Sequence, residues 1–170
     1  MKLHFAYTSP INSPGSFPGL TQKQEAVANL HPRWQVFRGL QIKARSPQAF
    51  VPAIVECQVI SEDEKGLTRE VKFKEGMGPP GVEKVTEVVT YYGEMKADFE
   101  QVGLDTHISN IISASEDGLQ LTFTFSWNLP HLVEGSPEAQ EEEAVLRKMS
   151  ASAVKQTITQ IRRMVSEGKL

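Results

Sequence analysis

Three polar side chains interrupt apolar, strand-like faces in the middle of the chain: Arg69, Glu87 and Asn110. Arg69 lies in the alternating run Leu67–Phe73, Glu87 lies in the run Val85–Tyr91, and Asn110 stands between two isoleucines. Because alternate residues of a strand share a face, all three point where apolar side chains point. A single buried charge is costly and a paired one is tolerated, so we expect Arg69 and Glu87 to meet across neighbouring antiparallel strands.

This polar group suits acid–base chemistry on a small molecule. Glu87 would be the general base towards an acidic C–H or N–H, its pKa raised by apolar walls and lowered by Arg69. Arg69 and Asn110 would hold a developing enolate oxygen, which suits cyclisation, dehydration or isomerisation without a cofactor. Four aromatic residues of the strand-like runs are expected to form the walls of the ligand site: Phe73, Tyr91, Phe125 and Trp127.

Two other interpretations of Arg69 and Glu87 stay open at this point. The two residues could form a purely structural pair with no ligand beside it. One strand could also be displaced by one residue, which would turn its side chains to the opposite face and leave these charges in solvent.

Other motifs in the sequence give weaker evidence of a functional site than these three polar residues. The segment Gly76–Gly81 matches the dinucleotide pattern G-x-G-x-x-G, but strand-like runs flank it and its two prolines lack the backbone donors that cradle a phosphate. We expect a hairpin loop there. The four histidines have no ligand spacing, so no metal site is predicted. Cys57 alternates with polar residues, which favours a buried strand thiol over a nucleophile.

The elements that must position these residues follow from periodicity and turn signals. Alternation predicts a strand at residues 3–7, and helical composition predicts two helices at about 21–30 and 33–45. Short Gly- and Asp-containing separators predict an antiparallel meander of six further strands. Their expected ranges are 54–62, 67–75, 82–91, 94–101, 106–115 and 119–129.

A long helix follows the strands. Ser136 is a favourable N-cap, Pro137 suits the first helical position, and apolar residues then recur at helical spacing for about 30 residues, up to Gly168. An antiparallel sheet cannot cover its own apolar face, so we expect this helix to lie across it. The space between a curved sheet and such a helix is the expected small-molecule cavity.

Length and composition limit the number of domains and the possible partners and location of the protein. The 170 residues make one domain, residues 1–170, and the net charge of −3 gives no attraction for nucleic acid. No run approaches the roughly 18 apolar residues of a membrane span. The lone cysteine fits a reducing compartment, so we expect a cytoplasmic monomer or homodimer. The ending Gly168-Lys169-Leu170 is close to the peroxisomal Ser-Lys-Leu signal and gives a weak alternative location.

Several segments together resemble a known family. The chain is similar to the AtaL-like family of small fungal proteins, within the START-like (SRPBCC, birch-pollen-allergen) superfamily; one of its members is encoded in the acetylaranotin biosynthetic cluster. The resemblance spans almost the whole chain, and residues 25–33 read as extra length against the family pattern. It is carried by Pro10–Asn12, Phe37–Leu40, Lys43–Phe50, Leu67–Val71, Leu121–Trp127 and Thr157–Arg162.

The resemblance implies an α+β helix-grip fold: a curved, seven-stranded antiparallel sheet wrapped on a long C-terminal helix, with two short helices after the first strand. It also implies that the partner is a small hydrophobic or aromatic metabolite, handled by a carrier or by a cofactor-free cyclase, dehydratase or isomerase of secondary metabolism. The alternative is a non-catalytic interaction or lipid-transfer module whose cavity is largely filled. The resemblance provides no catalytic motif, because fold alone does not fix chemistry.

Overall fold

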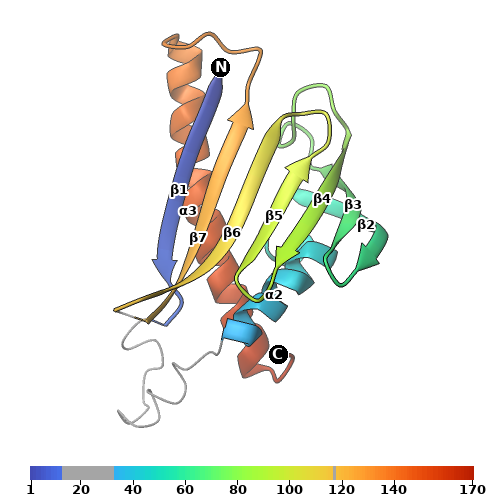
Figure 1. Ribbon diagram of the computed structural model, residues 1–170. Helices are drawn as coiled ribbons and strands as arrows, with labels where there is room; N and C mark the ends of the chain where they lie inside the picture. Colours follow the sequence, from blue (N-terminus) through green and yellow to red (C-terminus); the bar gives the residue numbers. More distant parts are fainter. Residues whose placement is uncertain (13–32, 117) are drawn as a thin grey trace.

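The computed structural model describes residues 1–12, 33–116 and 118–170 (Figure 1). Within this part of the chain, one antiparallel sheet of seven strands faces two helices. The first predicted helix, at about 21–30, lies outside the described residues. The second is α2 (Arg33–Arg45), followed by the short 3-10 helix η1 (Pro47–Ala49).

The sheet confirms the expected meander. Its order is β1-β7-β6-β5-β4-β3-β2, so six consecutive strands pair with their sequence neighbours and β1 closes against the last of them. Each strand boundary lies within about three residues of its predicted position. The strands are β1 (Lys2–Pro10), β2 (Ile54–Asp63), β3 (Gly66–Phe73), β4 (Lys84–Tyr92), β5 (Lys96–Gln101), β6 (Thr106–Ser115) and β7 (Gly118–Asn128).

Side-chain alternation sets the two faces of the sheet. In β7, Leu121, Phe123 and Phe125 are buried while the threonines between them are half-buried, as the pattern predicted. At the tight β2–β3 turn, Gly66 packs against β4 so closely that a Cβ atom there would lie 1.9 Å from the Val89 carbonyl oxygen. Only glycine fits that approach.

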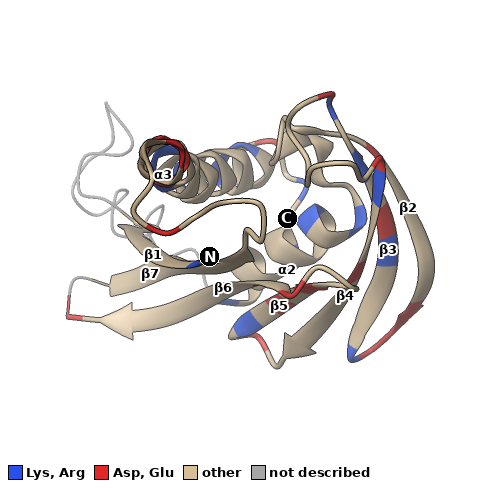
Figure 2. Ribbon diagram, turned by 90° about the horizontal axis from the view of Figure 1, so that it is seen from above, with Lys and Arg blue, Asp and Glu red and all other residues tan. Residues whose placement is uncertain are grey.

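Both helices lie on the concave side of the sheet (Figure 2). The long helix α3 (Pro137–Ser166) begins as predicted, with Ser136 Oγ accepting from the Ala139 amide, and it packs on β1 and β7. The shorter α2 sits within the curve and contacts α3 at Gly39, where a Cβ atom would be 2.6 Å from Ile161 Cγ1. None of the described helices is long and apolar enough to cross a membrane.

The main apolar core fills the space between the sheet and the two helices. Its largest buried side chains come from all three layers: Phe123 and Leu121 from β7, Leu40 from α2 and Ile161 from α3. Aromatic rings from β1, β4 and β7 and from α2 pack around this centre. The arrangement confirms the expected α+β helix-grip fold.

Candidate functional site

The buried charges meet as the sequence predicted. Arg69 on β3 and Glu87 on β4 are register partners, and each is 3% exposed. Arg69 donates to Glu87 Oε2 from Nη2 at 2.6 Å and from Nε at 2.8 Å. This burial excludes the alternative in which the two charges face solvent. The burial alone does not decide between a purely structural pair and a pair that contacts a ligand.

The pair also holds the end of a helix. Arg69 Nη1 donates to the backbone carbonyls of Lys43 at 3.2 Å and Ala44 at 2.7 Å, which belong to the last turn of α2. Carbonyls at a helix C-terminus have no partner within the helix, and a cation there is favourable. Glu87 Oε1 accepts from Gln101 Nε2 at 3.0 Å. Arg69 therefore ties α2 to the sheet, and both oxygens of Glu87 have protein donors.

A buried lysine, which the sequence analysis did not single out, lies beside this network. Lys43 is 6% exposed, and its Nζ donates to Asn110 Oδ1 at 2.7 Å. Burial lowers the pKa of the Lys43 ammonium to about 7; the positive charge of Arg69 acts in the same direction, and Glu87 partly opposes it. The lysine thus exchanges its proton near neutrality.

Two aromatic rings surround the lysine head. Its Nζ lies 4.1 Å from the centroid of the Phe123 ring and 5.5 Å from that of Phe99. The guanidinium carbon of Arg69 is 5.2 Å from the same Phe99 ring. These cation–π contacts replace part of the hydration that both cations lose on burial. Phe99 thereby joins the Arg69–Glu87 network to the Lys43–Asn110 pair in one polar centre.

Two buried polar atoms close to this centre lack a partner among the described residues: the Asn110 amide nitrogen Nδ2 and the Tyr91 hydroxyl. Both residues belong to one row across the sheet, in which Tyr91 pairs with Ala97 and Ala97 pairs with Asn110. The small Ala97 side chain separates them. An unpaired buried donor costs free energy, so each of these atoms calls for a hydrogen-bonding ligand or water.

The predicted aromatic walls divide into two groups. Phe125 is buried and stacks on Trp127 with ring centroids 4.8 Å apart, and both belong to the main core. Tyr91 meets Phe37 of α2 edge to face at 5.6 Å, and burial raises the pKa of its hydroxyl. Phe73 instead packs with a separate cluster near Ile54. The structure therefore brings the predicted polar residues together, with part of the predicted aromatic set.

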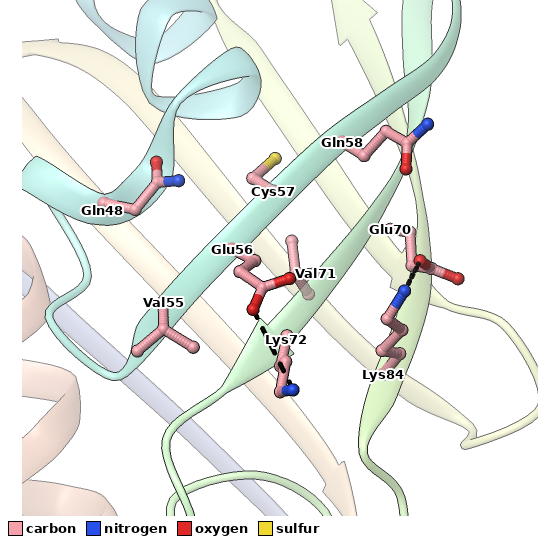
Figure 3. Close-up of a pocket in the computed structure, with 9 residues that line it drawn as sticks. All are labelled: Gln48, Val55, Glu56, Cys57, Gln58, Glu70, Val71, Lys72 and Lys84. Atoms are coloured by element: carbon pink, nitrogen blue, oxygen red, sulfur yellow. Dashed lines mark hydrogen bonds and ion pairs between the residues drawn. The ribbon is translucent and has the colours of Figure 1, made fainter.

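Side chains of the main core pack between the sheet and the helices. Two hollows found among the described residues lie elsewhere. One, of about 370 Å³, is lined by residues of η1, β2, β3 and the start of β4, and its charges are already paired, as in Glu70–Lys84 at 2.7 Å (Figure 3). Cys57 lines it as a partly buried strand thiol, and burial raises its pKa. The other, of about 290 Å³, lies between the η1 segment and α3.

Comparison with known proteins identifies a family. The sequence model of the AtaL family, described as acetylaranotin biosynthesis cluster protein L, matches residues 5–168. No curated protein sequence matches the chain.

Similar solved structures share the fold at low identity. The Zhui aromatase/cyclase from Streptomyces sp. R1128 is 13% identical with a TM-score of 0.66, over 97% of this chain and 96% of that one. The di-domain ARO/CYC StfQ from the steffimycin biosynthetic pathway is 12% identical with a TM-score of 0.62; 99% of this chain spans about half, 52%, of it. Ara h 8.0201 is 12% identical with a TM-score of 0.57, over 95% of this chain and 97% of that one.

Proposed function

The chain belongs to the AtaL family of acetylaranotin biosynthesis cluster protein L, and from that premise we propose that it binds a small hydrophobic or aromatic metabolite on the concave face of its sheet. Its role is that of a carrier or a cofactor-free cyclase or isomerase in secondary metabolism. The observation that carries the proposal is the buried amide nitrogen of Asn110, which has no partner among the described residues. A ligand oxygen would supply that partner.

The polar centre supports a ligand better than it supports a sealed core. Lys43, Arg69, Glu87 and Asn110 are each less than one-tenth exposed, in an interior otherwise built from aliphatic and aromatic side chains. Ligand sites in proteins combine such apolar walls with a few convergent polar groups. The Zhui and StfQ proteins, which share this fold, carry the description aromatase/cyclase.

Binding requires space that side chains now occupy. The elements that would move are α2 and the rings packed on it, because α2 reaches the sheet through the Arg69 bonds and the Lys43–Asn110 bond. A filled interior also favours a second candidate function, a non-catalytic interaction or lipid-transfer module. The two candidates differ in whether an aromatic molecule enters the concave face.

We keep Glu87 as the proposed general base, and its hydrogen-bond donors set a condition for that role. Its oxygens accept from Arg69 and Gln101, so it could take a proton only from a ligand that displaces one of these donors. Arg69 and Asn110 would then face the developing oxyanion. Equal turnover by wild type and Glu87→Gln would remove Glu87 as the base and leave the binding role in place.

Native mass spectrometry of freshly purified protein tests the binding role directly, because a co-purifying metabolite appears as a defined mass increment. A titration with 2-naphthol, followed by tryptophan fluorescence, tests it with a known probe. We expect saturable binding that weakens about tenfold in Asn110→Leu, the loss of one hydrogen bond of about 1.4 kcal/mol. Asn128→Leu, at the far end of β7, is the matched control. Absence of any binding to wild type would support the filled module instead.

A further inference from the structure

We infer that the side-chain amine of Lys43 is a nucleophile that forms an imine with a ketone or aldehyde group of the bound metabolite. The inference rests on the proposed function, because it takes the concave face as the ligand site. It names the ligand class: an apolar molecule that carries a carbonyl group. The residues that support the inference lie at the end of α2 and on the inner faces of β5, β6 and β7.

The setting of Lys43 differs from that of every other lysine the structure describes. It is the buried one, and no carboxylate of the described residues contacts it. Surface lysines such as Lys72, Lys84 and Lys96 pair with carboxylates at 2.7–2.8 Å. Glu87 is already engaged by Arg69 and Gln101. A lysine that is desolvated beside another cation and lacks a carboxylate partner is the arrangement that activates an amine as a nucleophile.

The protonation state follows from the same setting. With a pKa of about 7, half of the Lys43 amines are neutral at pH 7. An ordinary lysine has a pKa of about 10.4, so its neutral fraction at that pH is smaller by on the order of a thousandfold. The charged groups that act on the amine are Arg69 on β3 and Glu87 on β4. Burial is the main cause of the lowered pKa of Lys43; the charge of Arg69 acts in the same direction, and Glu87 partly opposes it.

Asn110 is placed to serve both partners of the reaction. Its Oδ1 accepts from Nζ at 2.7 Å and so orients the amine, while its Nδ2 is a buried donor without a partner among the described side chains. A carbonyl oxygen that accepts from Nδ2 would gain that bond as negative charge develops on it. One amide thus positions the nucleophile and the electrophile together.

The chemical step balances without a further reagent. The Nζ lone pair attacks the carbonyl carbon and forms a C–N bond, while the C=O π pair moves to oxygen. Oxygen receives the proton that nitrogen loses, giving a carbinolamine. The nitrogen lone pair then forms the C=N bond as the C–O bond breaks, the departing oxygen takes the remaining amine proton and leaves as one water, and the neutral imine remains. When protonated, the imine is a cation over the Phe123 ring, where the lysine head already lies 4.1 Å from the centroid.

Acetylacetone is a suitable probe, because a lysine amine converts it to an enaminone that absorbs in the near ultraviolet. The protein at pH 7 is mixed with the diketone and followed by absorbance, intact mass and peptide mapping. We expect one adduct, the mass of the diketone less one water, on the peptide that carries Lys43. Its rate should exceed that at an exposed lysine by about a hundredfold or more, as the difference in neutral fraction requires.

Three variants sharpen the test. Lys43→Met and Lys43→Arg should give no fast adduct, whereas Lys148→Met, which removes an exposed lysine of α3, should react like wild type. Asn110→Leu should slow the reaction about tenfold through loss of one hydrogen bond. If Lys43→Met does not fold, the peptide map of wild type still decides, since it needs no variant.

The possible failures are distinguishable. If native mass spectrometry detects non-covalent diketone or 2-naphthol but the map shows no adduct, or adducts spread over surface lysines, the imine inference is overturned and the binding role stands. If neither probe is retained and Lys43 is unmodified, the proposed function fails as well. A single fast adduct at Lys43 supports the inference.

Discussion

Replacing Arg69 with methionine should destabilise the protein by about 4 kcal/mol. Four hydrogen bonds disappear: two to Glu87 and two to the carbonyls of Lys43 and Ala44 at the end of α2. Removing one partner of a buried pair costs about 3–5 kcal/mol, because the other charge stays buried without compensation. Glu87 keeps only its bond from Gln101.

The double variant Arg69→Met/Glu87→Leu separates the pair from the rest of the network. Replacing both charges with apolar groups removes the uncompensated carboxylate, and such replacements are often close to neutral. The α2 carbonyls and Gln101 would still lack their partners, at about 1 kcal/mol each when buried. These three groups sum to about 3 kcal/mol, so we expect the double variant to lose about 3 kcal/mol, less than the single variant.

Urea denaturation at pH 7, followed by tryptophan fluorescence, measures both free energies of unfolding. Glu87→Leu completes the double-mutant cycle and gives the coupling energy. Two results would refute this reasoning: a loss below about 1 kcal/mol for Arg69→Met, or a double variant no more stable than the single one. Either would mean that the pair does not carry the helix anchorage assigned to it.

Three further predictions concern single positions. In the folded state the pKa of Lys43 is lowered, so the unfolded chain binds more protons between about pH 7 and 10, and the free energy of unfolding rises with pH in that range. In denaturant titrations wild type should gain up to about 1.4 kcal/mol per pH unit relative to Lys43→Met. A difference in unfolding free energy between the two proteins that stays constant with pH would contradict this prediction. Gly66→Ala should cost about 3 kcal/mol in the same assay, because its Cβ would lie 1.9 Å from the Val89 carbonyl oxygen; a near-neutral effect would show that this turn can shift. Ser136→Ala should cost about 1 kcal/mol through loss of the cap on the Ala139 amide, seen as a lower thermal midpoint, with Ser136→Asp retaining stability.

The sheet could be predicted because its signals are local. Two-residue alternation set the faces of β3, β4 and β7, and Gly-containing turns separated them. The face assignment in turn placed Arg69 and Glu87 together, which the register confirms. The pairing of β1 with β7 joins the first strand to the last, which are far apart in the sequence, so no turn between them signalled it.

The sequence pattern did not identify Lys43 as a site residue, because a lysine on a helix is usually exposed to solvent. The signal was nevertheless present: Phe37, Leu40 and Ala44 are buried and spaced three and four residues apart, and Lys43 lies on that same face of α2. The filling of the concave side could not be read from strand patterns either. It depends on how the side chains of α2 and α3 fit the sheet, which is a property of three-dimensional packing rather than of any one segment.

The polar centre lowers the stability of the folded protein, which argues that it has a function. A buried lysine with a pKa near 7 contributes less stability at neutral pH than an apolar side chain of equal volume would. The Asn110 amide nitrogen beside it is a donor with no partner among the described residues. Two such costs next to each other, beside the rings of Phe99 and Phe123, support the ligand site that we propose on the concave face. A ligand carbonyl against Asn110 Nδ2 and Lys43 Nζ would remove both costs at once. Saturating ligand should therefore raise the thermal midpoint of wild type more than that of Lys43→Met, because only wild type has the buried amine beside the Asn110 amide nitrogen.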